Sequence, residues 1–210
     1  MRPTRYYIES MPAQALLTAE ELLRLNLPNK RTELVRGVLI IREPAGYQHG
    51  DVAMRLGAAI HAYVEAHDLG RVFAAETGFT LARKPDTVRA PDVAFISNVR
   101  LPDPPPRGFA EMSPDLAVEV LSPDDRAGEV LENVADWLKA GTRLVWVVDP
   151  LRVIARVYRA DGSESLLGET DVLQGEEVLP GFTCAVSDVL RRRVPNASRR
   201  REERPEQRDE

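Results

Sequence analysis

The spacing of apolar residues predicts a long helix in the first third of the chain. Across residues 48–66, Val52, Leu56, Ile60 and Tyr63 recur every three or four positions, so they fall on one face of a helix. Polar residues fill the positions between them and would face water. We therefore expect an amphipathic helix that covers one side of a core.

Two further helices are indicated by their end signals. Thr18 and Glu21 have the spacing of a capping box, in which each side chain satisfies a free backbone N–H, so a helix is predicted over residues 18–25. Another is predicted over residues 125–140, because apolar residues again recur at helical spacing and Gly141 provides a C-terminal stop.

Short apolar runs rich in β-branched residues predict strands around these helices. The dipeptide Arg36-Gly37 separates the first two runs and indicates a tight hairpin. One late run is almost wholly apolar, as expected of a central strand that is covered on both faces. The predicted strands are residues 32–35, 38–42, 72–75, 79–82, 92–96, 116–121, 144–148 and 153–159.

The order of the elements predicts an α/β protein in which a mixed β-sheet is flanked by helices. The helix over 125–140 connects two strands, and such a crossover most often joins parallel neighbours. We assign residues 1–190 to a single domain. The charged tail at 191–210 has little apolar content, so we expect it to be disordered.

Composition narrows the classes of function. The chain has 210 residues and a single cysteine, Cys184, which excludes an intrachain disulfide and a cysteine-based zinc site. No apolar run approaches the roughly 20 residues of a membrane span, and the N-terminus lacks the apolar stretch of a secretory signal, so we expect a cytoplasmic protein with no membrane partner. The net charge of −5 argues against a broad basic surface that coats nucleic acid.

A carboxylate inside an apolar strand is the strongest chemical signal. Glu119 interrupts the run LAVEVL at residues 116–121, and burying an unpaired charge there costs several kcal/mol. Asp92 begins the preceding strand, and Glu33 lies in an earlier one. If the strands of Asp92 and Glu119 are antiparallel neighbours, the two acids meet, and a cation between them would offset their repulsion.

Oxygen ligands without cysteine favour Mg²⁺ or Mn²⁺ over zinc. Because Mg²⁺ usually takes one or two carboxylates and binds substrate phosphates, the acids favour phosphodiester hydrolysis. Two structural alternatives stay open. Glu119 could form an internal salt bridge with an arginine, and Asp92 could cap backbone N–H groups in the turn after Pro91.

Six sequence blocks in a fixed order carry a family resemblance: ELVRG at 33–37, His49, PDVAFI at 91–96, DLAVEVLSP at 115–123, GTRLVWVVDP at 141–150 and LPGF at 179–182. Together they resemble the Uma-two family of restriction endonucleases, within the PD-(D/E)XK nuclease superfamily. The resemblance spans most of the chain. It implies a restriction-endonuclease-like fold and a Mg²⁺- or Mn²⁺-dependent endonuclease that acts on DNA.

The resemblance also implies roles for individual residues. Asp92 and Glu119 would bind the metal ion, the backbone carbonyl of Val120 would be a further ligand, and Glu33 would support the same site. His49, at the start of the long predicted helix, would contact phosphate or position water. Nucleases of this kind often pair two sites to cut two strands, which is compatible with a homodimer, although the sequence shows no interface.

The chain departs from the family at the catalytic cation. The superfamily places a lysine two residues after the glutamate, where this chain has Leu121, and the Glu-Lys pair that the family carries on the next helix is Glu132-Asn133 here. Asn133 is neutral and cannot stabilise negative charge in the transition state as a cation does. Arg126 or Arg143 could compensate. Two interpretations follow: an endonuclease with Asn133 at the lysine position, or a nuclease-fold protein of weakened catalysis that binds nucleic acid or another protein.

Overall fold

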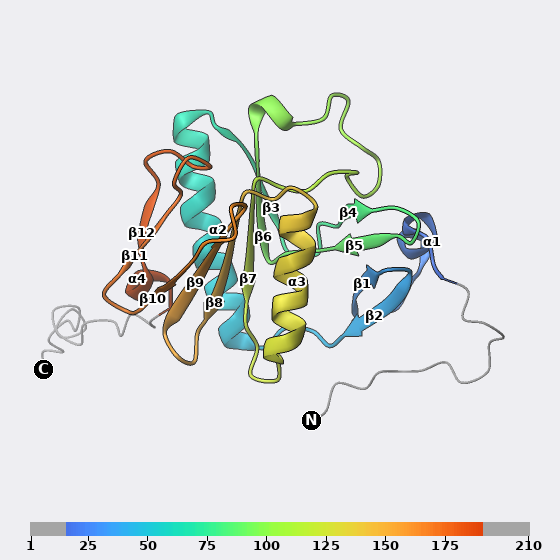
Figure 1. The fold of residues 1–210 in the computed structure, drawn as a ribbon, viewed down its shortest axis with the longest axis horizontal. Helices are drawn as coiled ribbons and strands as arrows, with labels where there is room; N and C mark the ends of the chain where they lie inside the picture. The colour runs from blue at the N-terminus through green and yellow to red at the C-terminus, as the bar shows by residue number, and fades with distance from the viewer. Residues whose placement is uncertain (1–15, 191–210) are drawn as a thin grey trace, which may run out of the picture.

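A six-stranded mixed sheet forms the centre of the computed structural model, which describes residues 16–190 (Figure 1). The tail predicted at 191–210 lies outside the described residues. In spatial order the strands are β10 (Glu164–Leu167), β9 (Ile154–Arg159), β8 (Leu144–Asp149), β7 (Leu116–Val120), β6 (Val93–Ser97) and β3 (Gly70–Ala74).

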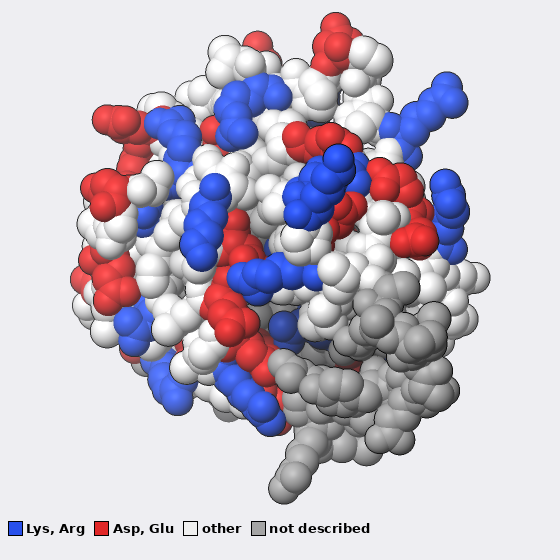
Figure 2. Space-filling view, turned by 45° about the vertical axis from the view of Figure 1, so that its right-hand side comes forward, with Lys and Arg blue, Asp and Glu red and all other residues white. Residues whose placement is uncertain are grey.

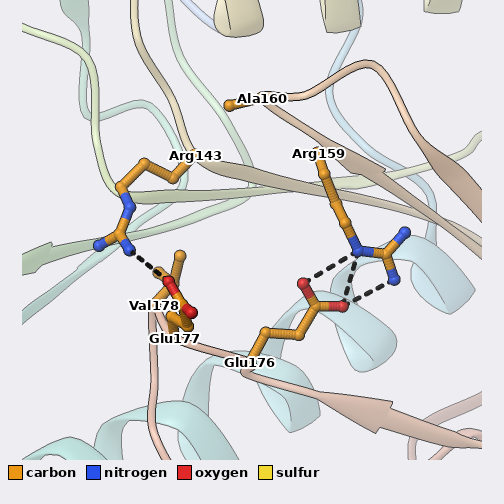
Figure 3. A pocket seen from close by; sticks show the side chains of 6 residues that line it. All are labelled: Arg143, Arg159, Ala160, Glu176, Glu177 and Val178. Carbon is orange, nitrogen blue, oxygen red and sulfur yellow. Dashed lines mark hydrogen bonds and ion pairs between the residues drawn. The ribbon is translucent and has the colours of Figure 1, made fainter.

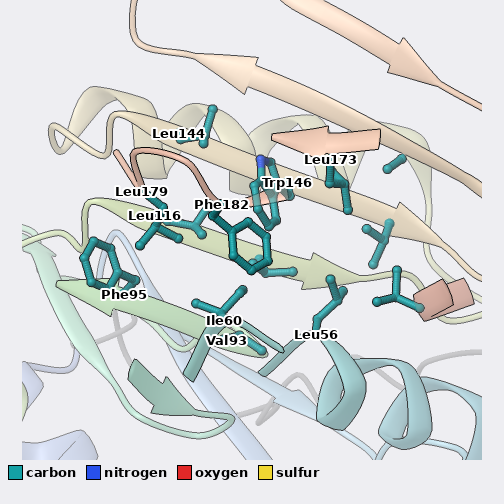
Figure 4. Close-up of a cluster of buried hydrophobic side chains, with 14 of the residues drawn as sticks. Leu56, Ile60, Val93, Phe95, Leu116, Leu144, Trp146, Leu173, Leu179 and Phe182 are labelled. Atoms are coloured by element: carbon teal, nitrogen blue, oxygen red, sulfur yellow. The ribbon is translucent and has the colours of Figure 1, made fainter. Parts of the chain in front are cut away.

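Two helices, α2 (Tyr47–His67) and α3 (Ala127–Lys139), cover opposite faces of this sheet (Figure 1). Alternate residues along each strand point to opposite faces, so each helix packs on a different set of side chains. The α2 side holds the larger core, which includes the predicted helix residues and the strand residues drawn in Figure 4: Leu56, Ile60, Phe95, Leu116 and Trp146. The α3 side holds Ala94, Ala117, Val145 and Trp137.

The predicted crossover is confirmed, since α3 connects β7 to β8 and these two strands are parallel. The helix begins later than expected. The N–H of Ser122 donates a hydrogen bond of 2.8 Å to the side chain of Asp125, which closes a turn, and the helix starts at Ala127 with Arg126 as its N-cap residue.

A second, four-stranded sheet lies beside the first. The sequence pattern predicted a single mixed sheet and did not show that these strands form a sheet of their own. The predicted hairpin is confirmed: Arg36 and Gly37 both have positive φ, 50° and 79°, as the tight turns of hairpins require. One strand of this sheet was not predicted, because it is only three residues long and ends just before Pro91. The spatial order is β2 (Val38–Arg42), β1 (Arg31–Val35), β5 (Thr87–Arg89) and β4 (Phe79–Ala82).

The remaining elements surround the two sheets, and the C-terminal ones contribute Leu173, Val186 and Val189 to the core on the α2 side. The capping box predicted at Thr18 and Glu21 is present at the first helix. No helix within residues 16–190 has the length and apolar character to cross a membrane. These elements are α1 (Ala19–Arg24), the 3₁₀ turn η1 (Asn98–Arg100), the hairpin of β11 (Val172–Gln174) and β12 (Thr183–Ala185), and α4 (Val186–Leu190).

Candidate active site

Antiparallel pairing of β6 and β7 brings Asp92 beside Glu119. Val93 pairs with Val118, so the next step of the register sets Asp92, just before β6, opposite Glu119. The N–H of Asp92 donates to the carbonyl of Val118 at 3.0 Å, which extends the ladder by one residue. The expected antiparallel neighbours are therefore present, and the two acids meet at the end of this strand pair.

Three donors hold the buried carboxylate of Asp92, whose side chain is 2% exposed. Its Oδ2 accepts a hydrogen bond of 2.7 Å from the N–H of Val120 and lies 3.1 Å from Nε2 of His49. Its Oδ1 lies 3.2 Å from Nη2 of Arg31. A carboxylate has about four lone-pair positions, so one position on Oδ1 stays open. The backbone N–H that Asp92 caps is that of Val120 in strand β7. Asp92 therefore does not cap the turn after Pro91, which was the structural alternative.

Glu119 points to the face of the sheet that α3 covers, two residues after Ala117. Its Oε1 accepts a hydrogen bond of 2.8 Å from Nε1 of Trp137, and the nearby side chain of Asn133 also lowers its pKa. Burial, together with the charges of Asp92 and Glu33, raises the pKa of Glu119 to about 8, although Trp137 and Asn133 act in the opposite direction. Trp137 and Asn133 are both neutral, so Glu119 does not form the internal salt bridge with an arginine that was the structural alternative.

Glu33 anchors the segment that leads into Asp92. Its Oε1 accepts a hydrogen bond of 3.0 Å from the N–H of Ala90, and its Oε2 accepts one of 3.0 Å from Nη1 of Arg89. Arg89 is itself buried and donates to Asp136 of α3 at 2.7 Å. This arginine therefore connects the small sheet to the helix that carries Asn133.

His49 reaches the site from the first turn of α2. Its side chain is 8% exposed, and its Nε2 faces Asp92. Its Nδ1 is buried without a hydrogen-bond partner among the described residues. The five predicted side chains thus lie near one another: His49 contacts Asp92, and Asp92, Glu33 and Asn133 all influence the pKa of Glu119.

The cation nearest the acids is Arg31, which the sequence interpretation missed. It lies two residues before Glu33 on β1, and alternation along a strand puts both on one face, so the signal was present. The two arginines proposed as substitutes lie elsewhere. Arg126 pairs with Glu129 at the start of α3. Arg143 precedes β8, at the opposite end of the strands from the acids.

Arg143 instead lines a cavity of about 290 Å³, where it lies 3.8 Å from Glu177 (Figure 3). Across the same cavity Arg159 donates to both carboxylate oxygens of Glu176. Each charge that Figure 3 draws has an opposite partner, so this cavity offers no free cation to a phosphate. On the face drawn in Figure 2, basic and acidic side chains are interspersed, with no broad basic area.

The donors at the acid pair fit a hard divalent cation. Asp92 keeps one open position, Glu119 carries a second carboxylate, and Mg²⁺ usually takes one or two carboxylates and completes its shell with water. Within residues 16–190, no three His, Cys, Asp or Glu side chains are arranged to hold a metal ion. A bound ion would therefore rely on Asp92, Glu119 and non-side-chain ligands such as the carbonyl of Val120, and the position of that carbonyl as a ligand stays a prediction.

Comparison with known proteins agrees with this architecture. A crystal structure titled as "a putative nuclease belonging to DUF820", from Anabaena variabilis ATCC 29413, matches with a TM-score of 0.73 at 22% sequence identity, covering 83% of this chain and 97% of that one. This likeness confirms the restriction-endonuclease-like fold. No curated protein matches the chain. The model of the Uma2 family, described as "Putative restriction endonuclease", matches residues 19–187. The chain therefore belongs to the Uma2 family.

Proposed function

We propose that this protein is a Mg²⁺- or Mn²⁺-dependent endonuclease that hydrolyses phosphodiester bonds in DNA. The observation that carries the proposal is the register of β6 and β7, which sets Asp92 against Glu119 in a desolvated position where like charges raise a carboxyl pKa. A divalent cation is the partner that such a pair lacks. Family membership supports the same class of reaction.

A bound ion would supply polarisation of a phosphoryl oxygen and activation of water. Asp92 and Glu119 would hold it, with the carbonyl of Val120. The rest of the site fixes the orientation of these ligands. Val120 and His49 occupy Oδ2 of Asp92, so Oδ1 would be the oxygen left for an ion. Trp137 fixes the rotamer of Glu119.

The positive charge of the site would come from Arg31 and not from α3. Arg31 is 22% exposed along its side chain and also lies 3.5 Å from Glu76, so a phosphate would compete with two carboxylates for its guanidinium. Asn133 can donate a hydrogen bond but carries no charge. For this reason the second candidate function is a nuclease-fold protein that binds nucleic acid with weakened catalysis.

Incubation of the protein with plasmid and Mg²⁺ or Mn²⁺ separates the two functions. Cleavage by the wild type that disappears in Asp92→Ala supports the endonuclease. Cleavage only after Asn133→Lys supports the binding protein. Calorimetric titration with the metal ion measures binding independently of cleavage. Asp161→Ala, which removes an exposed acid outside the site, is the matched control for Asp92→Ala. Absence of metal binding in every variant contradicts both functions.

A further inference from the structure

A second cavity, of about 220 Å³, opens directly beside the acid pair. The first turn of α2 and the loops that follow β7 and β8 form its walls. His49 lines this cavity and also contacts Asp92. Leu121, another wall residue, directly follows Val120. The cavity is therefore next to the acid pair, with His49 between its wall and Asp92.

Flat apolar groups dominate the wall. Tyr47, Pro123, Pro150 and Leu151 all line the cavity. Tyr47 is 83% exposed and Leu151 is 63% exposed, so two large apolar side chains are open to water beside a site of phosphate chemistry. An aromatic ring in that position can stack on a nucleobase, and such stacking is largely independent of base identity.

Polar groups at one side of the cavity suit a phosphate. The 21-residue helix α2 begins at N-cap residue Gly46, which makes no side-chain capping hydrogen bond, and its first turn contains no acidic residue. Free N–H groups at a helix N-terminus attract anions. His49, in the same turn, supplies an independent observation: its buried Nδ1 lacks a partner among the described residues, while its other ring nitrogen faces Asp92.

We propose that this cavity receives one unstacked nucleobase of the DNA strand next to the phosphate held at the acid pair. The base stacks on Tyr47, and the phosphate of the same nucleotide lies at the first turn of α2. The volume is below the roughly 300–1,000 Å³ of sites for drug-sized ligands, so it suits one base and not several. Because a paired base cannot enter, the protein prefers single-stranded or locally opened DNA. This inference rests on the proposed function for the placement of the neighbouring phosphate.

Fluorescence anisotropy tests the inference with the full chain in buffer that contains a chelator, so that binding is measured without cleavage. The probe is a short fluorescein-labelled single-stranded oligonucleotide. Tyr47→Ala is expected to weaken binding about 5- to 150-fold, the range for loss of one stacked base. Tyr47→Phe keeps the ring and binds as the wild type does. Met54→Ala, an exposed residue of the same helix outside the cavity, is the matched control.

An abasic oligonucleotide of the same length separates base from phosphate recognition. It is expected to bind more weakly than the normal oligonucleotide and to be insensitive to Tyr47→Ala. The inference is overturned if Tyr47→Ala binds normally, if the abasic strand binds as well as the normal one, if a closed duplex binds more tightly, or if the wild type binds no oligonucleotide. If the wild type cleaves plasmid but Tyr47→Ala binds the oligonucleotide normally, this inference is wrong and the proposed nuclease function stands. If binding depends on Tyr47 but no variant cleaves plasmid, the nuclease function is wrong and the base-binding site stands.

Discussion

The backbone N–H of Val120 donates a hydrogen bond of 2.7 Å to Oδ2 of Asp92. One strand of the site thereby fixes the acid of the other, and the oxygen that remains for a metal ion is Oδ1. Arg31 lies 3.2 Å from that same oxygen. A metal ion and the arginine would therefore share one oxygen, and their positive charges would repel each other.

Replacing this arginine should tighten metal binding. In Arg31→Gln we expect the affinity for Mn²⁺ to rise about tenfold, because one neighbouring charge alters the affinity of a carboxylate for a cation by that order. Isothermal titration calorimetry provides the measurement, and Arg126→Gln, at an exposed arginine of α3, is the control. A weaker affinity in Arg31→Gln would show that the arginine organises the site instead of competing for it.

The metal-free protein should lose stability as the pH rises through the titration of Glu119. The unfolded carboxyl ionises near 4.5, whereas the folded one keeps its proton until about pH 8. Between these values the folded state binds the additional proton, so the free energy of unfolding falls with increasing pH. Below about pH 4.5 both states are protonated, and this contribution is fully present.

Urea unfolding between pH 5 and pH 8.5 in the presence of a chelator measures this dependence. Glu119→Gln cannot ionise, so its stability should fall less over the same range. Glu177→Gln, at an acid with a 95% exposed side chain, should follow the wild type. Parallel curves for the wild type and Glu119→Gln would mean that Glu119 ionises normally in the folded protein.

A cation at the end of the Glu119 carboxylate should raise the cleavage rate. Asn133 already lies close enough to that carboxylate to lower its pKa, so Asn133→Lys places a positive charge next to it. We expect plasmid cleavage to increase about 100- to 1,000-fold, the range for a single group that stabilises transition-state charge. Asn133→Met, which has a long uncharged side chain, should not show this gain; an equal gain in both variants would exclude the charge as its cause.

Arg89 should be essential to the stability of the fold. It is buried between Glu33 and Asp136, so Arg89→Met removes their one buried cation and leaves them only the more exposed Arg42 and Arg36. Breaking a buried ion pair from one side costs about 3–5 kcal/mol of unfolding free energy. Arg126→Met, at an exposed ion pair, should cost no more than about 1 kcal/mol. Urea denaturation at neutral pH compares the two variants, and equal small losses would refute the bridging role.

Contacts along and between predicted strands could be anticipated from the sequence. The apolar runs identified the strands of Asp92 and Glu119, and their pairing brings the acids together. The role of Arg89 could not be anticipated, because its strand β5 in the second sheet is too short to give a periodic signal. Arg31 could have been found, because it lies two residues before Glu33 on β1 and shares its face. The contact of Trp137 with Glu119 depends on how α3 is rotated against β7, which periodicity alone does not determine.

The indole of Trp137 gives the acid pair an intrinsic optical signal. The chain contains two tryptophans, and only Trp137 hydrogen-bonds Glu119, while Trp146 packs on the opposite face of the sheet. Neutralisation of Glu119 by a proton or by an ion changes the field at the Trp137 ring and leaves Trp146 shielded. Emission from Trp137 in Trp146→Phe can therefore follow site occupancy in real time, without label, nucleic acid or turnover.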